Sequence, residues 1–377
     1  MNHRKLGWLV AATLVASLAA QTSGASGAIA LEKSGRLPEA EQAWRHIVQE
    51  NPKDAAALAS LGLVLSKEEK YEGAATAYRA AIAISPRLPG VRVNLGLAEF
   101  KQGHFDVAIS PLSTALAADP RNQQVRTLLG MSYYGAKRYA EAVKYLAPVA
   151  KLDPANTELH QILAQSCLWA KQYACATGEF RLILQKNPDS PAAHMLTGEA
   201  LDGLNETEEA IAEFQAAAKV APQEPNVHFG LGFLYWKLHQ YDDARSNFEQ
   251  ELSISPENPQ ALMYLGDTEM KQSNPEKALP LLEKAVQLKA DPRMGYLDLG
   301  TVLTRLKRYP EAIAALQHAE QLEPSKPEVH FRLGRLYQLA GNAAESQKEF
   351  STARSLYEKA DEKETLAPKM SASPPPL

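Results

Sequence analysis

The sequence contains little cysteine, few aromatic residues and no excess of positive charge. Of its 377 residues, 2 are cysteines and 7% are aromatic. Two cysteines exclude a disulfide-rich scaffold and a zinc site built from cysteine alone. The 40 basic and 44 acidic side chains give a net charge of −4, which disfavours nucleic-acid binding through a clustered basic face. The chain also lacks any run of about 18 consecutive apolar residues, so a multi-span membrane protein is excluded.

The remaining composition is that of a folded, non-membrane chain. Hydrophobic residues make up 45% of the sequence and charged residues 22%, which is typical of globular proteins. Because aromatic residues are sparse, the core is expected to consist mainly of alanine and leucine.

Residues 1–25 have the three parts of a secretory signal. A basic start at residues 3–5 precedes an apolar run over residues 6–20, and small residues follow. The run has about 15 residues, fewer than the roughly 20 of a membrane span. Cleavage after Ala19 and cleavage after Ala25 both fit the pattern. We therefore expect residues 1–25 to be a signal peptide and the rest to be exported, held at the membrane only if the signal stays uncleaved.

One fixed sequence period organises the rest of the chain. Proline, alanine and glycine each recur with a period of 34, with one proline skipped and Ala164 once in place of glycine. The repeated positions are Pro52, Pro86, Pro120, Pro154, Pro188, Pro222, Pro256 and Pro324; Ala40, Ala74, Ala108, Ala142, Ala176, Ala210, Ala244, Ala278 and Ala312; and Gly62, Gly96, Gly130, Gly198, Gly232, Gly266, Gly300 and Gly334. Such a period predicts a stack of equivalent supersecondary units.

Each unit has the pattern of two packed helices. In residues 225–258, apolar residues occur twice at helical spacing, separated by a short polar break. The in-phase glycine and alanine are small because two helix axes about 8–10 Å apart leave no room for larger side chains. The proline lacks an N–H group, so it ends one helix and prepares the next.

The spacing of the repeated residues resembles that of the tetratricopeptide repeat (TPR). The residues that carry this resemblance in one unit are Leu61, Gly62, Ala74, Tyr78, Ala81 and Pro86. The pattern covers residues 55–360 as nine units of this period, after an incomplete first unit at 26–54. The resemblance implies an all-α fold, a right-handed α-solenoid of helix-turn-helix repeats. The repeats are similar to those of exported bacterial proteins, which implies a periplasmic or secreted location.

The C-terminal end of the array and three of its units differ from the pattern. The second helix of the last unit is polar on most faces, including Glu349, as expected of a cap. Thr207 and Pro275 replace aromatic residues and Ser346 replaces alanine, which we expect to loosen single hairpins. Residues 361–377 end in a proline-rich stretch and are expected to form a disordered tail.

No catalytic or cofactor-binding motif is found, and the repeats leave no room for a separate catalytic domain. We therefore expect a protein that is not an enzyme and uses no cofactor or metal. His160, His194, His228 and His330 occupy the same slot of their units. Equivalent slots of adjacent units are about 8–10 Å apart, whereas the ligands of one zinc ion lie within about 2.1 Å of it. One zinc ion held by these histidines of adjacent repeats is therefore excluded, and packing roles are expected.

Cys167 and Cys175 lie on the two helices of one predicted hairpin, at similar distances from its turn. Antiparallel helices can bring them within the Cα separation of about 4.4–6.8 Å that a disulfide requires. An oxidising compartment would favour this bond. The alternative is that both are small buried residues at ordinary packing positions.

The resemblance implies that three positions of each first helix line a concave groove. In three successive units these positions and their neighbours carry Met195, Phe229, Phe233, Trp236, Lys237, Met263, Asp267, Met270 and Lys271. Aromatic and methionine side chains bordered by charge are typical of a peptide-binding groove. The alternative is that some of them, above all Phe229 and Met263, only pack against the neighbouring repeat.

The functional expectation is a non-catalytic scaffold or adaptor that binds protein or peptide segments in an envelope or secreted assembly. The alternative is a carbohydrate-binding solenoid of an exopolysaccharide export system. In that case Tyr134, Trp169 and Trp236 would stack on sugar rings.

Overall fold

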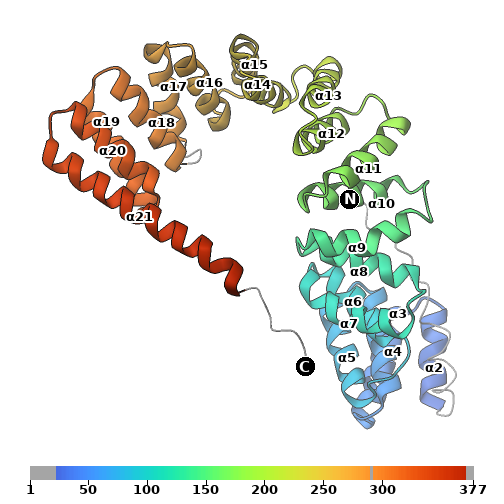
Figure 1. Ribbon diagram of the computed structural model, residues 1–377. Coiled ribbons are helices and arrows are strands. Elements are labelled where there is room, and N and C mark those ends of the chain that lie inside the picture. The colour runs from blue at the N-terminus through green and yellow to red at the C-terminus, as the bar shows by residue number, and fades with distance from the viewer. Residues whose placement is uncertain (1–22, 289–291, 371–377) are drawn as a thin grey trace. The chain divides into compact units, whose positions relative to one another are not determined.

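A computed structural model describes residues 23–288 and 292–370. Within these ranges the chain forms 20 α-helices joined by short turns and contains no strand (Figure 1). The chain divides into two compact units, Met1–Pro188 and Asp189–Leu377, which are described separately. None of the described helices is both long enough and apolar enough to cross a membrane.

Unit 1 consists of five helical hairpins. Its helices are α2 (Ser23–Lys33), α3 (Leu37–Glu50), α4 (Ala55–Lys67), α5 (Tyr71–Ile84), α6 (Val91–Lys101), α7 (Phe105–Ala118), α8 (Gln123–Gly135), α9 (Tyr139–Ala150), α10 (Thr157–Trp169) and α11 (Tyr173–Lys186). The second helix of each hairpin contacts the first helix of the next one in the unit. Each hairpin therefore buries its apolar faces against its neighbours, as in a solenoid.

Unit 2 contains five further hairpins of the same kind. Its helices are α12 (Pro191–Gly203), α13 (Thr207–Val220), α14 (Val227–Lys237), α15 (Tyr241–Ile254), α16 (Pro259–Lys271), α17 (Pro275–Gln287), α18 (Pro292–Arg305), α19 (Tyr309–Leu322), α20 (Pro327–Leu339) and α21 (Ala343–Met370). The fold is thus the predicted all-α solenoid of helix-turn-helix repeats.

The periodic small residues lie where the two helices of a hairpin cross. All nine in-phase alanines have an exposed fraction of 0%. A Cβ atom added to any of the eight in-phase glycines would lie 2.4–2.8 Å from a side chain on the second helix of the same hairpin. In the hairpin of α14 and α15, for example, Gly232 packs against the ring of Phe248. The predicted reason for the small residues is therefore correct, because a larger side chain would separate the helices.

The turn inside each hairpin also follows the repeat period. One residue per turn has a left-handed backbone, with φ between 57° and 79°, although only three of the ten are glycine. These residues are Gly35, Glu69, Gly103, Lys137, Lys171, Asn205, His239, Ser273, Lys307 and Gly341. A non-glycine residue in this conformation costs about 1–2 kcal/mol. The packing of the hairpin therefore overrides the local preference at seven turns.

The repeats that depart from the sequence pattern still form hairpins. Pro275 is the first residue of α17, where a missing N–H group costs little. Ser346 is buried at the alanine position, and its hydroxyl group donates to the carbonyl oxygen of Gly334 at 2.8 Å. The first repeat, expected to be incomplete, is a complete hairpin of α2 and α3, with Trp44 buried in its core.

Two predicted boundaries differ from the structure. The tail expected to begin at residue 361 continues α21 as far as Met370. Strong helix formers dominate the sequence at that point, which allows the helix to extend beyond the repeat. The helix α2 begins at Ser23, before the expected boundary at residue 26. The rest of the predicted signal, residues 1–22, and the chain end at 371–377 lie outside the described residues.

Candidate peptide-binding surface

Four aromatic side chains of unit 2 meet between α14 and α16. Phe229, Phe233 and Trp236 follow one another along α14, with ring centroids 6.4 and 6.2 Å apart. Each also meets the ring of Tyr264 on α16 edge to face, at 5.9, 5.3 and 5.2 Å respectively. These distances are within the range of favourable aromatic contacts. We call Phe233, Trp236 and Tyr264, with Phe229 beside them, the aromatic surface.

The members of the aromatic surface differ in how much they contribute to the core. Phe229 lies 6.0 Å from the ring of Phe248, which is fully buried, and packs against the core of the α14–α15 hairpin. This contact supports the packing alternative for Phe229. Trp236 and Tyr264 pack against the same core, but Phe233 and Trp236 are only partly buried, so each keeps exposed area for a ligand. Sequence reasoning does not single out Tyr264, because it lies one position after Met263, the predicted groove residue.

Polar groups hold the aromatic surface in place. The indole N–H of Trp236 donates to Oδ2 of Asp267 at 2.7 Å, which fixes the orientation of the ring. The ammonium group of Lys237 forms an ion pair with Asp202 and lies 5.9 Å from the centre of the Phe233 ring. This distance permits a cation–π contact. Lys271, at the end of α16, is exposed.

The three methionines predicted to line the groove have different environments. Met195 is partly buried and packs against the core that surrounds Phe214. Met263 is also partly buried, and it packs against the core of the last repeats. Met270 has an exposed fraction of only 5% and belongs to that core. The prediction that Met270 lines the groove is therefore wrong, because its position faces the neighbouring hairpin.

A further acidic residue lies close enough to this region to interact electrostatically with it. The carboxyl group of Asp298, on α18, is largely buried, which raises its pKa to about 7. The negative charge of Asp267 adds to the increase, whereas the positive charges of Arg332 and Lys271 oppose it. No motif in the sequence distinguishes Asp298, because its burial depends on packing between repeats.

Unit 1 contains the cysteine pair and a second group of aromatic residues. Cys167 on α10 and Cys175 on α11 form a disulfide, with their Cα atoms 5.7 Å apart. Near them Trp169 has an exposed fraction of 48%. Its ring lies 5.8 Å from that of Tyr134 and 4.8 Å from that of Tyr139. These three residues form an aromatic platform in which Trp169 is exposed and the two tyrosines are partly buried.

The periodic histidines link the two helices of their own hairpins. Nδ1 of His160 lies 2.5 Å from Glu179, and the same atom of His194 lies 2.6 Å from Glu213. His330 and Glu349 form an equivalent pair at 2.8 Å. In each case the partner lies on the second helix of the same repeat. Each of these pairs therefore lies within one repeat, whereas Nδ1 of His330 also lies 3.8 Å from a carboxylate oxygen of Glu320 on the preceding repeat.

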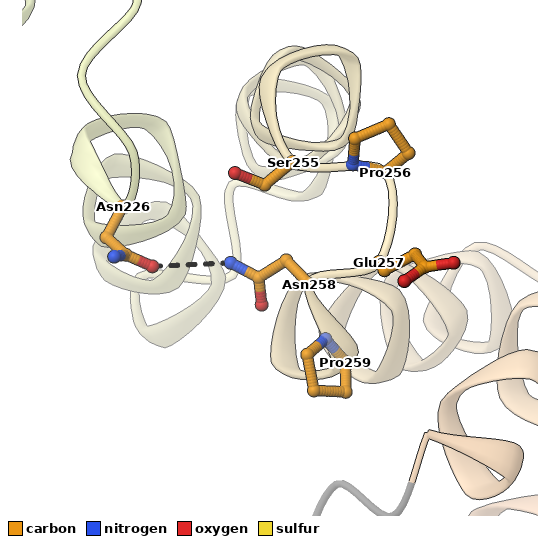
Figure 2. A pocket seen from close by; sticks show the side chains of 6 residues that line it. All are labelled: Asn226, Ser255, Pro256, Glu257, Asn258 and Pro259. Carbon is orange, nitrogen blue, oxygen red and sulfur yellow. Dashed lines mark hydrogen bonds between the residues drawn. The ribbon is translucent and has the colours of Figure 1, made fainter.

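A shallow depression at the start of α16 is lined by Asn226 and residues 255–259 (Figure 2). The amide of Asn258 donates to the side-chain oxygen of Asn226 at 3.3 Å across it. The buried carboxylate of Glu251 accepts hydrogen bonds from the backbone N–H groups of Asn226, at 3.0 Å, and Phe229, at 3.2 Å. The side chains thus cap the start of α14, and the depression is a product of this turn.

Comparisons with known proteins agree with the repeat pattern. Family models described as tetratricopeptide repeat match residues 93–157, 229–295 and 133–200, and a model described as TPR repeat matches residues 66–103, 203–239 and 300–341. A search of curated proteins gave no match.

Many solved structures are similar to this chain, and three of them have sequence identities of 14–22%. The crystal structure of YrrB, a TPR protein with an unusual peptide-binding site, is 22% identical with a TM-score of 0.43, covering 47% of this chain and 91% of that one. A crystal structure of MamA is 21% identical with a TM-score of 0.42 and coverages of 44% and 96%. The APC/C hetero-tetramer Cut9–Hcn1 is 14% identical with a TM-score of 0.49 and coverages of 89% and 81%.

The family assignment rests on the models and the observed hairpins together. The matched segments extend over most of the chain from residue 66 to residue 341, and each contains consecutive helices that pack against each other. The fold of this family is a scaffold for protein binding. The chain belongs to the tetratricopeptide repeat family.

Proposed function

We propose that this protein is a non-catalytic TPR scaffold outside the cytoplasm that holds an extended peptide segment on the aromatic surface. The observation that carries the proposal is the meeting of Phe233, Trp236 and Tyr264, which are partly exposed and held at fixed angles. Rigid aromatic groups at a surface lose little entropy on binding and dominate the energetics of protein recognition.

The polar surroundings indicate what kind of segment would fit. An apolar side chain of the ligand would pack on Phe233 and Trp236. Lys271 lies on the same helix as Asp267, the hydrogen-bond partner of Trp236, and so it lies beside the aromatic surface. Its exposed ammonium group would attract an acidic side chain of the ligand there. The proposed ligand is therefore an extended segment with an apolar residue next to an acidic one.

The experiment compares proteins captured by cross-linking in cells. The wild type is run beside a Phe233→Ala, Trp236→Ala double variant, both checked for equal helicity by circular dichroism. Phe331→Ala is a matched control, because Phe331 is exposed on a different repeat. The proposal expects a defined set of partners that the double variant loses and the control keeps. Capture of the same partners by all three proteins would show that the aromatic surface is not the binding site.

The location outside the cytoplasm is supported by the signal pattern of residues 1–25 and by the paired cysteines. Cleavage after Ala25 would remove the first turn of α2, including Ala25, whose side chain is buried in the core. Cleavage after Ala19 would leave α2 complete. We therefore favour cleavage after Ala19.

A second candidate function is glycan binding, which the aromatic platform with its exposed Trp169 ring favours. Exposed indole rings can stack on the apolar faces of sugars. Affinity electrophoresis in gels containing soluble polysaccharides tests this function. Retardation that is lost in Trp169→Ala supports it, and equal mobility with and without polysaccharide argues against it.

A further inference from the structure

Three side chains that commonly bind metal ions converge near the C-terminal end of the array. They are Glu320 on α19, His330 on α20 and Glu349 on α21. Nδ1 of His330 lies 2.8 Å from a carboxylate oxygen of Glu349 and 3.8 Å from one of Glu320. The three ligand atoms all lie within 4.8 Å of one another. Three separate helices of unit 2 therefore present one nitrogen and two oxygens to the same point.

The imidazole of His330 is oriented by a backbone carbonyl. Its Nε2 lies 3.1 Å from the carbonyl oxygen of Pro324, which assigns the ring proton to Nε2. The Nδ1 lone pair then faces the two carboxylates. Metal-binding histidines commonly donate their second N–H group to a carbonyl or carboxylate in this way. His330 and Glu349 have exposed fractions of 5% and 8%, so both are shielded from water.

Among the described residues, only the pair of His330 and Glu349 has a third carboxylate close enough to share a metal ion. His160 and Glu179, and His194 and Glu213, are joined as His330 and Glu349 are. However, the position equivalent to Glu320 is Ala150 before the first of these pairs and Leu184 before the second. The additional carboxylate therefore occurs only at the last pair and is not required by the repeat.

The local charge balance also favours a cation. Two carboxylates around one imidazole leave a net negative charge even when the imidazole is protonated. Among the described residues, neither Glu320 nor Glu349 forms an ion pair with a lysine or arginine. Buried charge without compensation is costly, and a bound cation would remove this cost.

We propose that Glu320, His330 and Glu349 bind one divalent transition-metal ion, with Zn²⁺ the best match to one imidazole and two carboxylates. Tetrahedral zinc holds such ligands at about 2.0–2.2 Å, so a water molecule would complete the set. Glu320 is the most exposed of the three and can move to close the site. The ion would join the hairpin of α20 and α21 to the hairpin before it.

Calorimetric titration of the chelator-treated full chain with Zn²⁺ tests the proposal, with Co²⁺ absorption as a spectroscopic readout. The expected result is one equivalent of Zn²⁺ per chain and a higher unfolding temperature with the metal than without it. Glu320→Gln should weaken binding at least tenfold. Because Glu320 is partly exposed, this variant is expected to fold, which circular dichroism checks.

Glu179→Gln is the matched control, because it alters an equivalent histidine pair that has no third carboxylate. It should leave Zn²⁺ affinity unchanged. The proposal is overturned if the wild type binds no Zn²⁺, or if Glu320→Gln binds it with unchanged affinity. This outcome is independent of peptide binding, because the aromatic surface lies on other repeats.

Discussion

At the scale of single residues, Asp298 shows how packing between repeats controls charge. Burial and the nearby Asp267 raise its pKa to about 7, whereas the reference value of an aspartate in an unfolded chain is about 3.9. Between these values the folded chain binds a proton that the unfolded chain releases. Stability therefore falls as the pH rises from about 4 to about 7, and it stays lower above that range.

This linkage predicts that Asp298→Asn stabilises the protein at pH 8. The amide carries no charge to be buried, so the free energy of unfolding should rise by about 4 kcal/mol at pH 8 and hardly change at pH 4. Urea unfolding at both pH values measures the effect. Asp243→Asn, at an exposed position, should leave the pH dependence as it is. An equal change at both pH values in Asp298→Asn would contradict the account.

At the scale of helices, the hairpin crossing explains why glycine occurs inside helices at all. Glycine in a helix interior costs about 0.5–1 kcal/mol relative to alanine. At Gly232 close packing requires glycine despite this cost, because a Cβ atom would lie 2.7 Å from the Phe248 ring. At Gly178, in α11, a Cβ atom would meet nothing within 4 Å.

The two glycines should therefore respond to alanine in opposite directions. Gly232→Ala should destabilise unit 2 by about 1–3 kcal/mol, because overpacking outweighs the gain in helix propensity. Gly178→Ala should stabilise unit 1 by about 0.5–1 kcal/mol. Thermal unfolding monitored by circular dichroism measures both changes. Stabilisation by Gly232→Ala would show that the helices separate freely, against the packing described above.

Much of the helix arrangement is predictable from the sequence, because the periodic residues reflect contacts inside one hairpin. The alanines, glycines and prolines predict the stack of hairpins and most helix boundaries. The left-handed turn position has the same period but no such signal, because lysine, glutamate and other residues occupy it more often than glycine does. The end of α21 is not predicted, because helix propensity carries it beyond the last repeat.

The candidate site is less predictable, because it depends on contacts between repeats. Phe233 and Trp236 are found from their spacing on one helix. Tyr264 and the burial of Met270 follow from how α16 packs against its neighbours. Likewise, Glu349 is expected on a solvated cap, but it is buried against His330. These contacts have no signature in the sequence of a single repeat.

At the scale of the whole molecule, export and disulfide formation make a joint prediction. The intact mass of the protein purified from its source should correspond to a chain that begins at Ala20 and has Cys167 bonded to Cys175. Such a chain keeps α2 complete and has passed through an oxidising compartment. Mass spectrometry with and without a reductant measures both features. An uncleaved chain with two free thiols would contradict the proposed location.

The central claim is that the aromatic surface of unit 2 binds a peptide segment. The most direct test is a titration of the segment identified by cross-linking, prepared as a synthetic peptide, into the wild type and into the Phe233→Ala, Trp236→Ala variant. We predict saturable binding to the wild type and a loss of at least tenfold in affinity in the variant, because two aromatic anchors contribute most of the contact energy. Equal affinity for the two proteins would contradict the claim.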